Sequence, residues 1–228
     1  SPVHTIGNQI LEAIRLHRDV TKEEARTIAA RMLDRAGIPQ AKSRLDSYPF
    51  QLSGGMRQRA MIAMALCTQP RLVIADEPTT AVDVTIQAQI LELMKELRDE
   101  FEMAILLITH DLGVVAETCE FVHVMYMGKI VESGPVGQIF ENPLHPYTQA
   151  LLGSIPRLTG PLSERLTVVK GSVPGPYARV PGCVFHPRCE KAISGVCDAG
   201  VPPSLEQIEP GHQTACHLYD QREVEAKK

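Results

Sequence analysis

The sequence contains no apolar run that approaches the roughly 18 residues of a membrane-spanning helix, and no signal peptide is recognisable. We therefore expect a soluble chain that reaches a membrane only through a partner. An excess of positive charge is also absent, because the net charge of −4 gives no general reason to expect nucleic acid as a partner. The composition, 44% hydrophobic and 22% charged, is otherwise ordinary for a globular protein of one large or two small domains.

Two motifs with well-known chemistry are missing as well. The 228 residues contain no G-x-x-x-x-G-K-[ST], the loop that cradles nucleotide phosphates in many ATPases. None of the six cysteines belongs to a C-x-x-C pair of the kind typical of zinc sites. Because no secretion signal is present, the cysteines argue against a disulfide framework and leave metal binding or simple burial.

Hydrophobic periodicity predicts alternating helices and strands up to Gly134. Helices are predicted over 5–17, 22–35, 56–67, 84–101 and 112–119, buried strands over 72–75 and 104–109, and a hairpin over 121–132. A capping box, Thr21-x-x-Glu24, opens the second helix. This order favours an α/β domain with a mixed sheet. Beyond Gly134 prolines and glycines become dense and only 146–152 looks helical, so we expect a loop-rich extension after a boundary near residue 155.

Two short motifs, about twenty residues apart, have the clearest chemistry. The first, Leu52–Gln58, places a hydroxyl and two glycines just before a predicted helix, where free backbone N–H groups and the helix dipole can hold an anion. The second is the apolar run 72–75, which ends in Asp76 and Glu77. Carboxylates at the C-terminal end of a strand can present a Mg²⁺ contact and a base that positions water.

Together these motifs resemble the signature and Walker B elements of the ATP-binding-cassette (ABC) ATPases. The resemblance implies a P-loop NTPase fold with a helical subdomain at about 5–60 and a catalytic α/β part at about 61–140. It also implies that the signature loop contacts the γ-phosphate of an ATP held by the opposite subunit, with the Ser53 hydroxyl and the Gly55 N–H as donors. The other residues implied in this contact are Leu52, Gly54, Met56 and Gln58.

The same resemblance assigns the expected catalytic groups. Asp76 would support Mg²⁺, and Glu77 would act as the general base on the attacking water. The run 81–83 has the spacing of the D-loop, in which Asp83 reaches the partner subunit. His110, at the end of the run 105–110, matches the switch histidine that contacts the γ-phosphate. ATP and Mg²⁺ are the implied ligands. Without this context, a glycine pair before a helix is often only a turn. Adjacent carboxylates at a strand end are sometimes only a surface turn, and a lone histidine at a strand end is usually structural.

A further segment indicates which branch of the family the chain resembles. Residues 142–152, followed by Ser154-Ile155-Pro156, are similar to the region after the cassette in the ATPases of dipeptide, oligopeptide and nickel importers. The stretch Asn8–His17 is similar to these ATPases too. The resemblance implies an ATPase subunit that powers peptide uptake from the cytoplasmic face of the inner membrane. Its partners would be a second, homologous or identical ATPase subunit, permease subunits and, indirectly, a substrate-binding protein, with no nucleic acid.

The missing phosphate loop is the main departure from that family. Asn8–His17 matches the stretch just after the Q-loop, so we expect the chain to be the C-terminal part of such a subunit. Residues 1–155 would then belong to the ATPase domain, 156–220 to the extension and 221–228 to a polar tail. A non-catalytic remnant or a metal-binding interaction module is the alternative. A DNA-repair or chromosome-associated cassette fits poorly because long coiled coils are absent.

Four cysteines fall in the proline-rich extension, with the spacing C-x5-C-x7-C-x18-C: Cys183, Cys189, Cys197 and Cys216. Spacing alone leaves a metal site and unligated thiols equally open. A segment with almost no apolar core needs a cross-link or a bound metal to stay folded. Four thiolates suit either a [4Fe–4S] cluster or Zn²⁺. We therefore expect a metal here, with the cluster favoured. Cys67 and Cys119 lie in apolar helices and are expected in the core.

Overall fold

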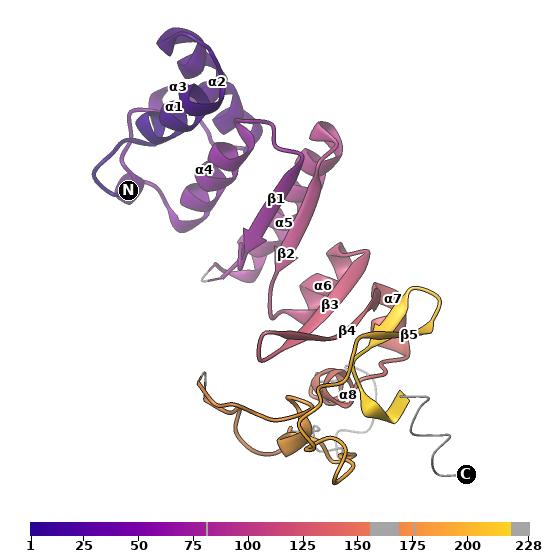
Figure 1. Cartoon of the computed structure of the whole chain (residues 1–228). Helices are drawn as coiled ribbons and strands as arrows, with labels where there is room; N and C mark the ends of the chain where they lie inside the picture. The colour runs from indigo at the N-terminus through magenta and orange to yellow at the C-terminus, as the bar shows by residue number, and fades with distance from the viewer. Residues whose placement is uncertain (81, 156–168, 176, 220–228) are drawn as a thin grey trace. The chain divides into compact units, whose positions relative to one another are not determined.

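The computed structural model describes residues 1–80, 82–155, 169–175 and 177–219 (Figure 1). The chain divides into two compact units, Ser1–His110 and Asp111–Lys228. None of the helices in these described ranges is long and apolar enough to cross a membrane.

The first unit opens with a group of helices: α1 (Ile6–His17), α2 (Lys22–Arg35), α3 (Ala41–Arg44) and α4 (Gly54–Leu66), with a 3₁₀ turn at Pro49–Gln51 before α4. The apolar faces of these helices share one core, which includes Ile10, Ile14, Leu33, Leu45 and Leu66. Both α1 and α2 begin at threonine N-caps, and α2 has the predicted capping box. The helical group is thus set by amphipathic spacing together with local capping.

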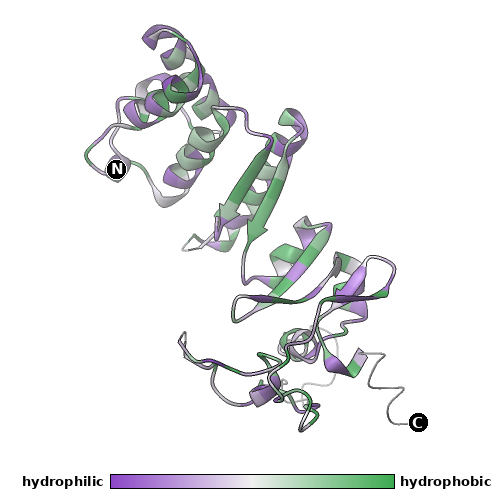
Figure 2. Cartoon of the chain, in the orientation of Figure 1, coloured by the Kyte–Doolittle hydropathy of each residue, from purple (hydrophilic) through white to green (hydrophobic). Residues whose placement is uncertain are grey.

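A parallel strand pair follows α4. Strand β1 (Leu72–Asp76) and β2 (Ala104–Ile108) are joined by α5 (Val84–Phe101), and Asp76 pairs with Ile108 in the register. Alternate strand residues pack with α5, including Ala75 against Ile90 and Met94. Figure 2 shows both strands as largely apolar.

The prediction that these strands are buried is right for one face only. Leu72, Ile74, Leu106 and Ile108 point to the face opposite α5 and are 46–62% exposed. The physical reason is that two strands with one crossover helix leave the second face uncovered by any described residue. An apolar run therefore indicated the strand correctly but not how many of its faces are covered.

The second unit combines short helices with an antiparallel sheet. Its elements are α6 (Leu112–Thr118), β3 (Phe121–Tyr126), β4 (Lys129–Pro135), α7 (Val136–Glu141), α8 (Pro146–Gly153), β5 (Glu206–Glu209) and β6 (His212–Thr214). Two 3₁₀ turns lie at His186–Arg188 and His217–Tyr219. The sheet order is β3-β4-β6-β5. Met127 and Gly128, both with positive φ, form the predicted hairpin turn between β3 and β4.

The α/β class is confirmed, with a parallel pair in one unit and an antiparallel sheet in the other. The sequence patterns did not indicate α3, α7, β5 or β6. Strand β6 pairs with β4 through Glu132 and Thr214, so the extension contributes strands to the sheet that contains the predicted hairpin. The structural units divide after His110, and the proposed boundary near residue 155 lies inside the second unit. Residues 156–168 and 220–228 lie outside the described residues.

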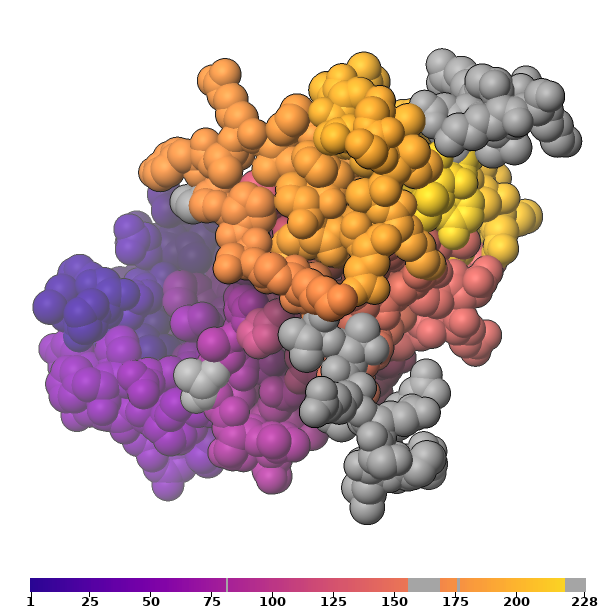
Figure 3. All heavy atoms as spheres, turned by 90° about the horizontal axis from the view of Figure 1, so that it is seen from below, coloured from indigo at the N-terminus to yellow at the C-terminus, as the bar shows by residue number. Residues whose placement is uncertain are grey.

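The extension also has a small apolar core, which corrects the expectation that it has almost none. Phe185 is buried, and its ring centroid lies 5.2 Å from that of Tyr126 and 5.4 Å from that of Tyr147. Val131 of β4 belongs to the same cluster. The sequence pattern missed this core because its members come from β3, β4, α8 and the extension, and no single segment is amphipathic. The surface formed by residues 169–175 and 177–219 can be followed in orange and yellow in Figure 3.

The α2 capping box gives a stability prediction. Replacing Thr21 by alanine removes the acceptor for the Glu24 N–H and should lower the free energy of unfolding by about 1 kcal/mol, whereas Thr21→Ser should not. The hydrogen bonds from the Thr21 N–H and hydroxyl lower the pKa of Glu24 below 4.5. The stability from this carboxylate is therefore present above pH 4.5 and lost as the pH falls through the folded-state pKa.

Urea unfolding followed by circular dichroism would test both points. The destabilisation by Glu24→Gln should shrink as the pH is lowered below 4.5. Equal destabilisation by Thr21→Ala and Thr21→Ser, or a Glu24→Gln effect independent of pH, would count against the capping account.

Candidate functional site

The predicted signature loop, Leu52–Gln58, lies at the start of α4. Ser53 is the N-cap, and its hydroxyl oxygen accepts the Met56 N–H at 3.3 Å. The Arg57 N–H is taken by the Ser53 carbonyl, so Gly54 and Gly55 supply N–H groups for which no described residue provides an acceptor. A Cβ on Gly54 would meet nothing within 4 Å. The loop thus presents two backbone donors without an acceptor among the described residues, one on exposed Gly54 and one on partly buried Gly55, at the positive end of a helix.

Three features place this loop against the rest of the first unit. A Cβ on Gly55 would come within 3.1 Å of Ile86 at the start of α5, so only glycine fits without displacement. The Gln58 side-chain amide donates to the carbonyl oxygen of Pro78, just after the carboxylate motif. Leu52 is buried in the helical core, where its side chain anchors the loop.

The carboxylate motif and His110 come together because β1 and β2 are parallel and in register. The Glu77 N–H donates to the Ile108 carbonyl at 2.9 Å, and His110 Nδ1 lies 2.8 Å from Glu77 Oε1. The hydroxyl of Thr80 donates to the other carboxylate oxygen. These hydrogen bonds, first from Thr80 and then from His110, lower the pKa of Glu77 below its ordinary value.

An ionised carboxylate can only accept, so His110 carries its hydrogen on Nδ1 in this contact. Glu77, which directly follows the end of β1, has a φ of 49°, in the left-handed region. The result is an oriented carboxylate beside an exposed imidazole. Thr80 was not identified from the sequence, although its position three residues after Glu77 was the available signal.

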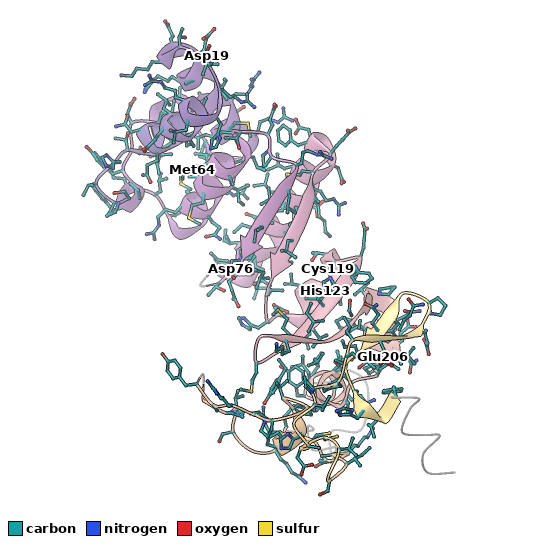
Figure 4. All side chains as sticks on the ribbon, viewed as in Figure 1. Asp19, Met64, Asp76, Cys119, His123 and Glu206 are labelled. Carbon is teal, nitrogen blue, oxygen red and sulfur yellow. The ribbon has the colours of Figure 1, made fainter. Side chains whose placement is uncertain are left out.

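The two other acidic site residues have different surroundings. Asp76 ends β1, where Figure 4 labels it, and is exposed. Asp83 is the N-cap of α5, and its side chain accepts the Ile86 N–H at 2.9 Å. Asp76, Glu77 and His110 therefore lie at the C-terminal ends of β1 and β2. Asp83 and the signature loop lie at the start of α5.

The four extension cysteines line one recess in the second unit, here called the thiol recess. Its volume is about 280 Å³, including the part open to solvent. The other lining residues are His145, Pro146, Phe185, His186, Lys191, His217 and Leu218. All six cysteines of the chain are free thiols. Cys67 is buried in the helical core as predicted, while Cys119 is only partly buried.

Burial and mutual proximity govern the thiol chemistry. Burial, with smaller contributions from the other three thiols, raises the pKa of Cys216 to about 12. Burial likewise raises the pKa values of Cys183 and Cys189. In the described part of the chain, no three His, Cys, Asp or Glu side chains are placed to hold one metal ion. The cysteines therefore surround a shared space without converging on a single point.

A buried carboxylate, which the sequence did not indicate, organises the wall of this recess. Glu132 on β4 is fully buried and accepts the N–H groups of Leu144 and His145 at 2.7 and 2.9 Å. His212 Nε2 of β6 lies 2.8 Å from the same carboxylate. Glu132 thus links a strand of the hairpin, the start of α8 and the C-terminal strand pair.

His145 belongs to the Glu132 network and also lines the recess. Its Nδ1 accepts the Tyr147 N–H at 3.0 Å and caps α8. Burial, opposed by the charge of Glu132, lowers the pKa of His145 to about 4, so the ring is neutral at pH 7. The Nε2 atoms of His145 and His217 are buried and have no hydrogen-bond partner among the described residues.

The Glu132 network can be tested by an isosteric change. Glu132→Gln replaces one acceptor oxygen by an NH₂ group that faces N–H donors, and should lower the free energy of unfolding by about 3 kcal/mol. Glu141→Gln, at an exposed position of α7, should change it little. Denaturant unfolding of both variants would measure the difference, and equal stabilities would show that the network contributes little.

Comparison with known proteins finds a family match in each half of the chain. Residues 3–80 match the family described as "ABC transporter", and residues 131–197 match "Oligopeptide/dipeptide transporter, C-terminal region". A putative peptide import ATP-binding protein of Brucella melitensis is 54% identical over 95% of this chain and 65% of its own length. The oligopeptide transport ATP-binding protein AppD of Bacillus subtilis is 51% identical over 99% of this chain and 68% of its own length.

Solved structures are similar in fold. CbiO1 from Clostridium perfringens, part of the ABC transporter complex cbiONQ, has a TM-score of 0.53 and 27% identity, covering 61% of this chain and 54% of its own. The ATP-binding cassette MJ0796, a dimer in a post-hydrolysis state bound to ADP and Pi, has a TM-score of 0.52 and 30% identity. That match covers 60% of this chain and 58% of the cassette.

Proposed function

The chain belongs to the family of ABC transporter ATP-binding proteins that includes these peptide-import proteins, and we propose that it is part of the ATPase subunit of a peptide importer. The proposal concerns the complete protein, since the chain spans 65% of the length of the Brucella relative. Its main support is the pairing of Glu77 with His110 at the end of two parallel strands, beside an exposed signature loop. The match to the peptide-transporter C-terminal region supports the substrate class.

In the proposed mechanism Glu77 is the general base. Phosphoryl transfer depends on positioning and on stabilising charge, and a base must be ionised and held in one orientation. Thr80 and His110 provide both conditions, because they orient the two carboxylate oxygens and lower the pKa of the group. His110, with 81% of its side chain exposed, can also reach the γ-phosphate.

The exposed donors and carboxylates fit the groups expected around the end of an ATP triphosphate. Asp76, at the C-terminal end of β1, would support Mg²⁺, which neutralises charge on the phosphates when bound. The Ser53 hydroxyl and the Gly55 N–H would donate to the γ-phosphate, with Leu52, Gly54, Met56 and Gln58 shaping the loop. By the resemblance to the ABC ATPases, the signature loop would act on ATP held by the opposite subunit.

This arrangement requires partners. We propose a dimer with a homologous or identical ATPase subunit, in which Asp83 of the D-loop faces the partner. The helical subdomain, residues 5–60, would receive permease subunits at the cytoplasmic face of the inner membrane, and a substrate-binding protein would act indirectly. Residues 61–140 would complete the catalytic part, with the extension beyond 155 specific to the peptide-transporter branch.

The assignment of Glu77 gives a direct test in the assembled transporter. Glu77→Gln keeps the shape of the side chain but removes the base, so ATP hydrolysis should fall by at least about 100-fold while ATP-driven dimerisation persists. Phosphate release and size-exclusion chromatography would measure the two effects. Glu92→Gln, on the exposed side of α5, is the matched control. Hydrolysis at the wild-type rate in Glu77→Gln would exclude Glu77 as base, and a wild-type transporter without turnover would favour a non-catalytic module.

For the thiol recess we propose an iron–sulfur cluster, most simply [4Fe–4S], held by Cys183, Cys189, Cys197 and Cys216. Four soft thiol donors around one space, together with buried unpartnered ring nitrogens, fit such a group. In a cluster each cysteine binds a different iron, so the sulfurs need not converge on one point. A single Zn²⁺, the alternative, requires sulfurs within about 2.3 Å of one ion, and no described group meets that requirement.

Metal content tests this second proposal. Protein purified without oxygen should contain iron and absorb broadly near roughly 400 nm, and serine at any of the four positions should abolish the absorbance. Cys67→Ser and Cys119→Ser should leave it unchanged. Because β6 pairs with β4, loss of the metal should loosen the extension without removing the β3–β4 hairpin. Zinc in place of iron would move the assignment to a structural zinc site. Protein that contains neither metal would overturn the proposal.

A further inference from the structure

The Nε2 atoms of His145 and His217, two residues that line the thiol recess, are buried without a hydrogen-bond partner among the described residues, and neither residue is among the proposed cluster ligands. His145 is 1% exposed and lines the thiol recess together with all four cysteines. Buried polar groups in folded proteins almost always have a hydrogen-bond partner, so an unsatisfied ring nitrogen at the edge of a ligand space indicates an interaction with the occupant.

The proton on this ring can be placed from geometry. Nδ1 accepts the Tyr147 N–H at 3.0 Å and therefore has no hydrogen of its own. In a neutral imidazole the hydrogen must then be on Nε2. The backbone of α8 and the Glu132 carboxylate hold the residue in place, since the His145 N–H donates to Glu132 at 2.9 Å. His145 thus presents a fixed N–H donor that lacks an acceptor among the described residues.

We propose that His145 donates its Nε2–H to a sulfur atom of the cluster in the thiol recess and thereby raises the reduction potential of that cluster. This inference rests on the proposed iron–sulfur site. The acceptor is a thiolate or sulfide sulfur, whose negative charge increases when the cluster gains an electron. A donor to that sulfur stabilises the reduced state more than the oxidised state. His145 is a positioning and tuning residue here, while the four cysteines are the ligands.

Two substitutions separate the donor role of His145 from its capping role. His145→Asn keeps an acceptor near the position of Nδ1, so it can cap α8, but it loses the donor at the Nε2 position. His145→Gln places its amide near the position of Nε2 and keeps the donor, but it loses the cap. A merely structural role for His145 predicts the reverse order of effects.

The experiment is an anaerobic redox titration of the full chain, with the reduced cluster followed by electron paramagnetic resonance and iron measured per chain. His145→Asn should shift the ratio of reduced to oxidised cluster about tenfold toward the oxidised form at fixed potential, a fall of about 59 mV for a one-electron couple. His145→Gln should keep the potential near that of the wild type. Unchanged potentials in both variants, or equal shifts in both, would overturn the inference.

A second measurement avoids dependence on the folding of His145→Asn. In wild-type protein with ¹⁵N-labelled histidine, pulsed electron paramagnetic resonance should detect hyperfine coupling between the reduced cluster and a histidine nitrogen. His145→Gln should abolish that coupling. No histidine coupling in the wild type, with iron present at full occupancy, would overturn the role of His145 alone. Wild-type protein without iron would instead overturn the proposed cluster and this inference with it.

Discussion

The parallel register of β1 with β2 is the constraint on which the candidate ATPase site depends. With Asp76 opposite Ile108, the residues that follow the two strands emerge side by side, and Glu77 meets His110 at 2.8 Å although they are 33 positions apart in the chain. A slip of one residue would turn the side chains to the other face and separate this pair. Helix α5 packs on one face of this pair, and Ile86 at its start lies so close to Gly55 of the signature loop that a Cβ there would come within 3.1 Å. The strand register together with the hydrogen bonds from Thr80 and His110 therefore orients the proposed base.

A comparable constraint organises the second unit. Glu132, fully buried, accepts hydrogen bonds from the N–H groups of Leu144 and His145 and contacts His212. A buried carboxylate is costly unless its oxygens are satisfied, and here every contact comes from a different stretch of the chain than β4 itself. The carboxylate therefore makes the hairpin, the start of α8 and the C-terminal strands interdependent. The thiol recess lies against this framework, which explains how a proline-rich segment with few apolar residues can place four cysteines around one space.

Much of this could be predicted from the sequence, where local signals were strong. Capping at Thr21, the periodicity of 84–101 and the motif spacing of Ser53, Glu77 and His110 are encoded within a few residues, and the structure confirms α5 and the helices and strands next to which the other residues lie. Features that depend on distant partners could not be predicted. The short strands β5 and β6 lack alternation of their own, Glu132 resembles any surface glutamate in a hairpin, and the exposed face of β1–β2 looks buried because both faces are apolar. Single-sequence patterns report which face of an element is apolar but not whether another segment covers it.

The claim that the signature loop acts on ATP held by another subunit is tested most directly by photo-cross-linking. In the complete protein, a benzophenone maleimide would be attached to a cysteine at Ser53 and, as a control, at the exposed Ser43 of α3. The protein without either substitution, treated in the same way, would account for label on the six native cysteines. Cross-linked peptides would then be identified by mass spectrometry with and without ATP. We predict that the Ser53→Cys probe reaches the phosphate-holding loop of the partner subunit only when ATP is present, and that the Ser43→Cys probe does not. An intersubunit yield at Ser53→Cys that is independent of ATP, or cross-links confined to its own chain, would contradict the proposed arrangement.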